Sequence, residues 1–425
     1  MSQSQSVSKP SGDLASSLLQ VNRLMYKMAP EIGITRHKTH QIDLPQQSIY
    51  TAGQQMIFEA QTGSAFIDCQ KSYMTFKIVA VGASTSSFGV GSGLNVIQDS
   101  LVLSRTGVEL DRLFNTNLYG KYKKDWQYTR DWKVCVAPSQ GGSKYDAPNG
   151  EWVPQSITSE ITVSIPMKDV SPFFNQTKLL PPQIMEGMRI RLDLASVYTA
   201  TLSAATITGY TIRDPQIHWS TVHLADAFRR KVAEMSASRG LVLLFKSVYH
   251  QQTSVNGTAL NFEIRKAASK ALACHIVPRL IDNVNAATKD SMSSEQFNFT
   301  TAQAHIGSDY FPQQALADGV NQFYTYCLQA HNKLCDGTSA PSALYSPAAA
   351  DDSYFGDNNS LKSQAAIAFD LNKSSGITDL DGFVINNSRA LVVDLSMASA
   401  NRRVDSFLEH LRCVKVYPSN CEVKD

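Results

Sequence analysis

Along most of the chain, hydrophobic and polar residues alternate with a period of two, which predicts β-strands rather than helices. The pattern begins near Ile49 with "IYTAGQQMIFEA", "SYMTFKIVAVG" and "NVIQDSLVLSRTGVEL", where Gly and Ser separate β-branched and aromatic residues. It resumes in "SEITVSIPM" and "MRIRLDLASVY", and it ends in "TIRDPQIHWSTVHL". The prolines of "KDVSPFFNQTKLLPPQIMEG" predict a loop or broken short helices between two of these strands. The pattern therefore indicates an antiparallel sheet system.

The first 45 residues follow a different pattern. A Ser- and Gln-rich start leads into "LASSLLQVNRLMYKMAP", in which Leu18, Val21, Met25 and Met28 recur at helical spacing. These side chains form an apolar stripe on a short amphipathic helix. We therefore expect residues 1–45 to form an N-terminal arm, with the stripe as an assembly contact. The alternative is that the stripe packs back onto the arm's own β-domain.

A polar helical segment divides the strand-rich remainder into two parts. The segment "ADAFRRKVAEMSASRG" covers 225–240 and ends at Gly240, a residue type that suits a helix terminus. After it the alternating pattern restarts with "LVLLFKSVYHQQTSV". The sequence thus predicts an arm (1–45), a first β-domain (46–224), a linker helix (225–240) and a second β-domain (241–425).

The two β-domains repeat one order of elements. "LVLSRTGVELDRLFNTNLYGKYKKDW" and "FNFTTAQAHIGSDYFPQQALADGVNQFYTYCLQA" each run from strand through a turn at Gly107 or Gly307 to a Tyr-rich helical segment. Further on, "ITVSIPM" and "MRIRLDLAS" correspond to "AIAFDLN" and "RALVVDLSMAS". This order favours internal duplication over two unrelated β-domains. A unit of about eight strands with long loops is typical of a jelly roll, so we predict an all-β chain of two tandem eight-stranded jelly rolls, with short helices in the connecting loops.

Composition and motifs give little sign of catalysis. The chain has 425 residues, 43% of them hydrophobic, and a net charge of +2, which does not indicate a strongly basic nucleic-acid binder. Its seven cysteines form no CxxC pair, and we interpret them as reduced thiols. The basic clusters "KYKKDW" and "FRRK" could meet phosphates, but helix faces in solvent or between domains explain them equally well. We therefore predict that the protein has no catalytic, metal or cofactor site and is not an enzyme.

Several segments resemble a known family: "LSRTGVELDRL", "IPMKDVSPFF", "LLPPQIMEGMRIRLDL", "HIGSDYFPQQAL" and "VDSFLEHLRCVKVYPSNCEVKD". With the tandem layout, they are similar to the double jelly-roll major capsid proteins of eukaryotic DNA viruses. The resemblance is closest to polinton-like viruses, virophages and relatives among nucleocytoplasmic viruses, and it covers about 41–425.

The resemblance implies a structural role in a virion. Three chains would form a capsomer with a nearly hexagonal outline, and capsomers would tile an icosahedral shell with penton and minor capsid proteins. The long loops 133–152 and 333–361 would be outward or intersubunit elements, and the arm would lie inside, near the genome or an internal membrane. The segment "MSQSQSVSKPSGDLASS" has no apolar signal core and the chain shows no membrane-spanning run, so we expect synthesis in the host cytoplasm. From the near-neutral charge we expect no sequence-specific nucleic-acid contact. The alternatives are a cytosolic lectin-like β-sandwich and, less favoured, a hydrolase on a β-scaffold.

Overall fold

A computed structural model describes most of the chain after the predicted arm. The described residues are 34–82, 86–88, 91–146, 151–203, 207–284, 286, 289–294, 299–317, 320–331, 333–334, 366–372, 382–386, 388–397, 401–418 and 420–425. The predicted assembly contacts Leu18, Val21, Met25 and Met28 lie outside these residues, as does the predicted loop 333–361 apart from residues 333 and 334.

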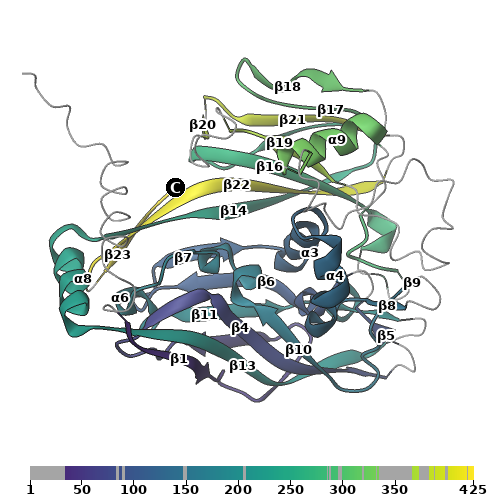
Figure 1. Cartoon of the computed structure of the whole chain (residues 1–425). Helices are drawn as coiled ribbons and strands as arrows, with labels where there is room; N and C mark the ends of the chain where they lie inside the picture. Colours follow the sequence, from purple (N-terminus) through teal and green to yellow (C-terminus); the bar gives the residue numbers. More distant parts are fainter. Residues whose placement is uncertain are drawn as a thin grey trace, which may run out of the picture.

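The first half forms a sandwich of two antiparallel sheets (Figure 1). One sheet has the order β1-β13-β4-β10, with β2 also pairing with β13, and the other has the order β3-β11-β6-β7. The strands are β1 (Ile34–Asp43), β2 (Ile49–Thr51), β3 (Gln55–Glu59), β4 (Phe66–Val81), β6 (Ile97–Leu103), β7 (Glu109–Leu113), β10 (Ile161–Pro166), β11 (Arg189–Leu194) and β13 (Gly209–Leu224).

The second half repeats this arrangement strand for strand. Its sheets have the orders β14-β22-β16-β19 and β15-β21-β17-β18, with β23 and β20 added to β22 and β16. The strands are β14 (Leu241–Val255), β15 (Ala259–Ile264), β16 (Ala268–Leu280), β17 (Phe299–Ile306), β18 (Asp309–Leu316), β19 (Ile367–Asp370), β20 (Phe383–Ile385), β21 (Leu391–Met397), β22 (Arg402–Val416) and β23 (Cys421–Lys424). The predicted tandem jelly rolls are confirmed, and the segments matched by sequence occupy corresponding places, β10 with β19 and β11 with β21.

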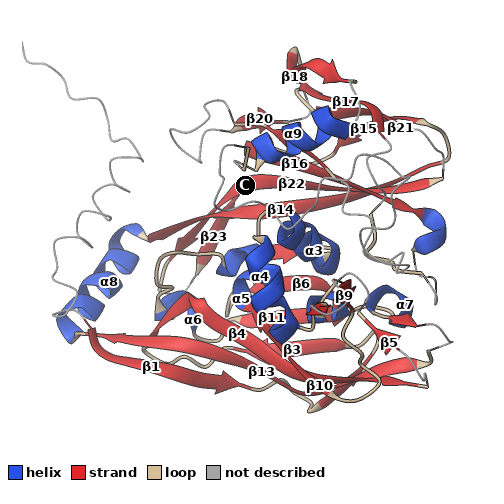
Figure 2. Ribbon diagram, turned by 45° about the vertical axis from the view of Figure 1, so that its right-hand side comes forward, coloured by secondary structure: helices blue, strands red, loops and turns tan. Residues whose placement is uncertain are grey.

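Helices lie in the connections, as Figure 2 shows. The Tyr-rich segments form α3 (Thr116–Trp126) after β7 and α9 (Val320–Ala330) after β18. The predicted turns before them hold Gly107 at φ 84° and Gly307 at φ 64°, a left-handed conformation that glycine adopts without strain. The remaining short elements are β5 (Ser86–Ser87), η1 (Gly93–Val96), α4 (Arg130–Cys135), η2 (Ala137–Gln140), β8 (Lys144–Asp146), β9 (Glu151–Val153), α5 (Met167–Val170), η3 (Pro172–Phe174), α6 (Pro182–Met185), α7 (Val197–Ala200), β12 (Leu202–Ser203) and η4 (Ile281–Asn283).

Two boundaries can be compared with the sequence prediction. Strand β1 pairs along β13 from Ile34, so the arm cannot extend to residue 45 as predicted, because 34–43 belong to the first sheet. Helix α8 (Asp226–Arg239) occupies the predicted linker and joins β13 to β14. That 46–224 and 241–425 fold as separate units stays a prediction.

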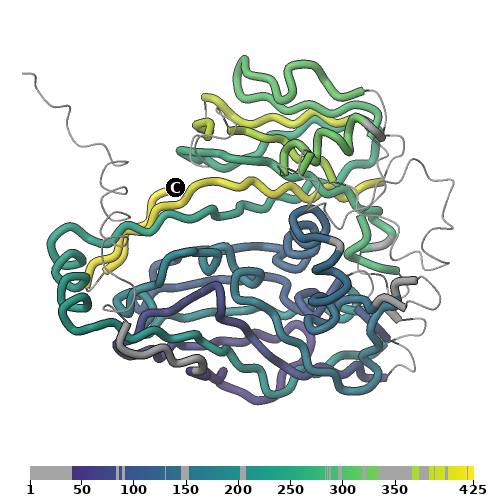
Figure 3. The backbone as a smooth tube through the Cα atoms, viewed as in Figure 1, coloured from purple at the N-terminus to yellow at the C-terminus, as the bar shows by residue number. Residues whose placement is uncertain are grey.

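The two sandwiches share part of their hydrophobic core. The tube in Figure 3 shows β14 and β22 running side by side from the second sandwich across the first. Leu243 and Phe245 of β14, with Val414 and Val416 of β22, join the buried cluster of the first sandwich, which contains Trp219 and Phe174. A second cluster fills the interior of the second sandwich around Phe369 and Leu408. The long strand pair thus couples the two halves through buried apolar area.

Candidate functional site

The most elaborate side-chain chemistry lies where the two sandwiches meet. We call this contact the seam: the outer face of β14, β22 and β16 against α3, β7 and η3. Its apolar part is one buried cluster to which both halves contribute: Leu113, Leu118, Tyr119, Tyr122, Trp126, Val248, Val277, Met292, Cys327, Ala366 and Phe407. Large aromatic side chains buried on both sides make the seam a core rather than a wet domain contact.

Helix α3 is buried in the seam although its sequence is rich in lysine. Lys121 and Lys124 are only 5% and 8% exposed. Lys121 forms an ion pair of 2.9 Å with Asp125, and Lys124 donates to the Ser92 hydroxyl at 2.9 Å. Burial lowers the pKa of Lys124, and the nearby carboxylates of Asp169 and Asp125 oppose that shift. The ammonium groups of Lys121 and Lys124 are thus buried against residues of the first half, and these two lysines are not available to a nucleic-acid phosphate.

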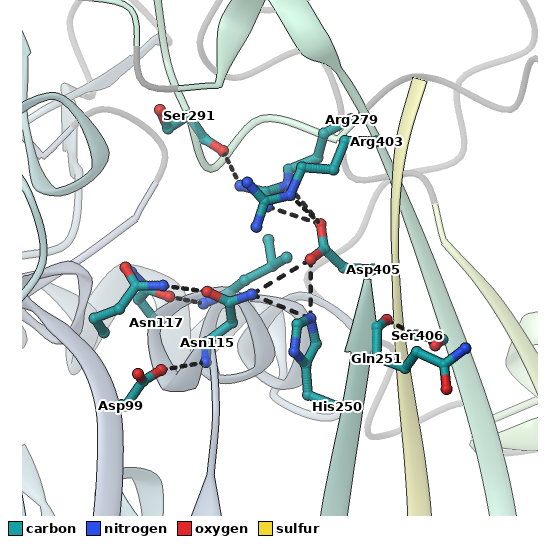
Figure 4. A network of polar contacts seen from close by, with 12 residues as sticks. Asp99, Asn115, Asn117, His250, Gln251, Arg279, Ser291, Arg403, Asp405 and Ser406 are labelled. Atoms are coloured by element: carbon teal, nitrogen blue, oxygen red, sulfur yellow. Dashed lines mark hydrogen bonds and ion pairs between the residues drawn. The ribbon is translucent and has the colours of Figure 1, made fainter. Parts of the chain in front are cut away.

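A buried carboxylate, Asp405 of β22, is the centre of one polar network (Figure 4). Arg279 of β16 donates to Asp405 Oδ2 through Nε at 3.1 Å and Nη2 at 2.7 Å. Arg403 Nε lies 3.5 Å from the same oxygen, and His250 Nε2 lies 2.9 Å from Oδ1. Burial alone would raise the pKa of Asp405, but Arg279, His250 and Arg403 outweigh it and hold that pKa well below its usual range.

Asn115 connects this network to the first sandwich. Its Nδ2 donates to Asp405 Oδ1 at 3.3 Å, and its backbone N–H donates to Asp99 Oδ1 of β6 at 2.9 Å. Asn115 adopts φ 51° at the start of α3, a left-handed conformation that Asn tolerates better than most residues. A single residue therefore starts the helix and links the two halves.

A second polar network lies along the seam and links α3 to β22 and β16. Tyr119 of α3 donates to Glu409 Oε1 at 2.8 Å, and His275 Nε2 lies 3.0 Å from the same oxygen. Tyr122 Oη lies 2.8 Å from His275 Nδ1 and 2.6 Å from His331 Nε2, so the hydroxyl can donate to one ring while it accepts from the other. The rings of His275 and His331 stack at a centroid distance of 5.4 Å. The network is thus a chain of acids, bases and hydroxyls from both halves.

Burial sets the protonation of this second network. Burial and the neighbouring His275 lower the pKa of His331 to about 3. Burial would raise the pKa of Glu409, but the charge and hydrogen bond of His275 and the hydroxyl of Tyr119 reverse the shift, so the carboxyl stays ionised. Burial also raises the pKa of the Tyr119 and Tyr122 hydroxyls well above their usual value.

A third link uses Asp111 of β7, which is fully buried. One carboxylate oxygen accepts from the Ser171 hydroxyl at 2.6 Å and from the Phe173 backbone N–H at 3.0 Å. The other accepts from the Ser247 hydroxyl of β14 at 2.7 Å. Asp111 therefore joins η3 and β7 of the first sandwich to the second one.

These arrangements suit a permanent contact better than a reaction. Asp405, Glu409 and Asp111 each accept hydrogen bonds from side chains of both halves or of neighbouring strands, and such satisfied polar networks rigidify a structure. The six cysteines in the described part are free thiols, and burial raises the pKa of Cys327 to about 12, which keeps that thiol protonated. Among described residues, no group of three or more His, Cys, Asp or Glu side chains is placed to hold a metal ion. No helix within the described ranges is long and apolar enough to cross a membrane.

The residue pattern of the sequence does not mark the seam residues as a site. Its only site proposal, the stripe of Leu18, Val21, Met25 and Met28, lies outside the described residues and stays a prediction. One signal was present in the sequence: Asp405, Phe407 and Glu409 alternate along one side of a strand whose other side carries Val404 and Leu408. An acid, an aromatic and an acid on one strand face could have suggested a covered polar face.

Comparison with known proteins defines the class of fold. No protein-family model matches the chain, and no curated protein matches its sequence. The chain shares the double jelly-roll fold of viral major capsid proteins whose structures have been solved. The sequence identities are so low that this likeness establishes the fold alone.

Three of these structures show how completely the fold agrees. The faustovirus major capsid protein matches with a TM-score of 0.62 and 9% identity, covering 96% of this chain and 95% of that one. VP54 of PBCV-1, as fitted into a reconstruction of the virophage Sputnik, matches with a TM-score of 0.59 and 10% identity, covering 94% and 99%. The mavirus major capsid protein matches with a TM-score of 0.53 and 11% identity, covering 100% and 97%.

Proposed function

We propose that this chain is the major capsid protein of a DNA virus, with a structural rather than a catalytic role. Three copies form a pseudo-hexagonal capsomer, and capsomers tile an icosahedral shell. The observation that carries the proposal is the repeated strand order of the two sandwiches, in a fold shared with viral major capsid proteins over nearly the whole of each chain. The seam supports the proposal because it joins the sandwiches into one block, which a shell subunit needs.

The proposed capsomer can be tested directly. We expect the purified chain to form a stable trimer at micromolar concentration without added ligand or metal, as measured by light scattering and native mass spectrometry. Exposed apolar side chains such as Leu44 (64%) and Ile49 (54%) are area that association can cover. Negative-stain micrographs should show particles of nearly hexagonal outline. A stable monomer would contradict the proposal and favour the lectin-like alternative.

The proposal also assigns a setting and partners. The protein would be made in the host cytoplasm and would reside in the virion, where penton and minor capsid proteins contact its capsomers. The loops 133–152 and 333–361 would lie at the outer or intersubunit surface. The genome or an internal membrane would lie on the side of the arm.

The arm has a separate test. We expect deletion of residues 1–33 to leave folding and trimer formation intact and to prevent closed-shell assembly, because a Ser- and Gln-rich start with an apolar stripe suits a partner rather than a core. The deletion stops before Ile34 because β1 is part of the first sheet. A full-length variant with Leu18, Val21, Met25 and Met28 all changed to Gln should fail in the same way. Shells that close normally without the arm would refute its assembly role, and a deletion that unfolds would place the stripe in the core.

A further inference from the structure

The seam covers elements of the first sandwich whose counterparts in the second sandwich remain uncovered. In β7, Asp111 and Leu113 are at most 1% exposed, because β14 and η3 pack against this face of the strand. The counterpart strand β18 is an edge strand with little covering, and its Tyr310 is 48% exposed. An uncovered edge strand with an exposed aromatic side chain is a site where another chain can pack.

The helices that follow these strands differ in the same way. In α3, ten of the eleven residues are buried against the seam and the first sandwich. In α9, Phe323 and Cys327 are buried, whereas Thr325 and Gln329 are exposed and Tyr324, Tyr326 and Leu328 are partly exposed. Of the two corresponding helices, α3 is therefore covered almost completely and α9 only on one side.

The outer faces of the two larger sheets differ in the opposite sense: the face in the second sandwich is covered, and the face in the first sandwich is exposed. In the second sandwich, His250, Phe407 and His275 form one row across β14, β22 and β16. The row points into the seam, because the next residues along β22 and β16, Leu408 and Cys274, belong to the second core. Phe407 is fully buried by α3 as a result.

The corresponding row in the first sandwich is Ile42, His218 and Tyr73, across β1, β13 and β4. It points outward, because the neighbouring Ile217 and Met74 belong to the first core. Among the described residues, α8 covers only one end of this sheet, where Phe228 and Val232 pack on Phe66, Val222 and Leu224 of β4 and β13. Ile42 remains 48% exposed. Ile49 of β2, also beside β13, is 54% exposed. Beyond the end that α8 covers, this sheet face carries apolar area that no described residue covers.

We propose that the uncovered parts fit each other between copies: β18 and α9 of one chain pack on the outer face of β1, β2, β13 and β4 of the next. The inference rests on the proposed function and specifies the partner surfaces of its capsomer. Figure 1 places β18 at one end of the molecule and β1 with β13 at the opposite end, so the two surfaces belong to different ends of one chain. A head-to-tail contact of this kind is heterologous and closes into a ring when the rotation allows. Three copies would then present six sandwiches joined by alternating contacts within and between chains.

The test uses cysteines placed on the two surfaces. Ile42→Cys and Tyr310→Cys are made singly and together in a Cys135→Ser background, which removes the thiol that is exposed among the described cysteines and serves as the baseline. A short bis-maleimide reagent is applied to the native assembly. We expect the double variant to give a covalent ladder that ends at the trimer and each single variant to give none above baseline, because a head-to-tail contact brings residue 42 of one copy to residue 310 of another.

The outcomes separate this inference from the proposed function. A ladder from either single variant would show a self-complementary contact and overturn the inference. Absence of a ladder from the double variant, while light scattering reports trimers, would also overturn it and leave the capsomer standing. A monomer by light scattering would remove the proposed function itself.

Charge substitutions give an independent measurement. We expect Ile49→Lys and Tyr310→Lys each to raise the concentration at which trimers dissociate by at least tenfold, with the unfolding temperature of the monomer little changed. Val242→Lys is the matched control, because Val242 is also exposed (37%) but belongs to neither surface. Equal effects of all three substitutions, or no effect of the first two, would contradict the assignment.

Discussion

Asp405→Asn is expected to destabilise the folded chain by about 3–5 kcal/mol, the cost of removing one partner from a buried ion pair. The substitution keeps the shape of the side chain but removes its charge. Arg279, which is 3% exposed, would lose its counter-ion, and Arg403 would lose its nearest carboxylate. Asp405 also accepts from Asn115, so the change weakens the contact between the sandwiches as well as the second sandwich itself.

Denaturant unfolding followed by tryptophan fluorescence measures this loss. Glu160→Gln is the matched control, because it removes a carboxylate from the exposed pair with Arg213 at 3.4 Å and should cost no more than about 1 kcal/mol. If the penalty comes from uncompensated charge, adding Arg279→Met to Asp405→Asn should give a total loss smaller than the sum of the two single losses. Strict additivity would refute this explanation, and equal effects of Asp405→Asn and Glu160→Gln would refute the importance of the network.

The sheets and their duplication could be predicted because they depend on local patterns. Alternation of apolar and polar residues marks a strand wherever one face meets a core, and the jelly-roll strands such as "RIRLDL" of β11 and "LVVDLSM" of β21 follow it closely. Gly107 and Gly307 marked the turns because each takes a positive φ. The prolines after β10 correctly indicated short broken helices, now α5, η3 and α6.

The seam could not be predicted because its partners are distant in sequence. Asn115 and Asp405 are 290 positions apart, and neither residue type indicates which strand or helix it will meet. Strand β22 is covered on both faces, yet its seam face carries Asp405 and Glu409, residue types that ordinarily indicate solvent. Only the fold brings Arg279 and His275 opposite these carboxylates and makes their burial tolerable.

The sequence places strand β1 in the predicted arm for a related reason. Its sequence "ITRHKTHQID" has few apolar residues, so the alternating pattern that marks the other strands is weak. The strand is held instead by backbone pairing along β13, an interaction that depends little on side-chain type. In the same way, the sequence leaves open whether the lysines of α3 face solvent or a domain contact, and only the fold shows that Asp125 and Ser92 allow two of them to be buried.

Acid should weaken the seam first through His331. The groups that face it are Tyr122 of α3, His275 of β16 and Glu409 of β22, with Lys333 nearby, and the ring also stacks on Trp126. Its pKa of about 3 in the fold lies far below the value near 6.5 of an unfolded histidine. Between these values the unfolded chain binds one more proton than the folded chain, so stability falls as pH decreases from about 6.5 toward 3.

The carboxylates add to this effect at lower pH. The pKa of Glu409 and that of Asp405 lie well below their usual values in the fold, so their stabilisation is complete above the unfolded pKa values near 4 and is lost below them. His331, Glu409 and Asp405 therefore all lower the stability of the fold as the pH falls. We therefore expect the free energy of unfolding to fall from about pH 6.5, and more steeply below about pH 4.5.

His331→Gln isolates the first part of this prediction. The amide can still bond the Tyr122 hydroxyl, but it does not titrate, so between pH 6.5 and 4.5 the variant should lose about 1.4 kcal/mol per pH unit less than the unmodified protein, the slope of one proton. Urea unfolding at half-unit steps of pH gives both slopes. His305→Gln is the control, because His305 is partly exposed on β17 and lies outside the seam, and it should leave the pH slope close to that of the unmodified protein. The slope of the unfolding free energy against pH should fall only in the His331 variant. Only that variant lacks a histidine that the fold keeps neutral at the contact between the two sandwiches. Parallel curves for His331→Gln and the unmodified protein would show that His331 titrates alike in the folded and unfolded chain, and would refute its part in the acid sensitivity of the seam.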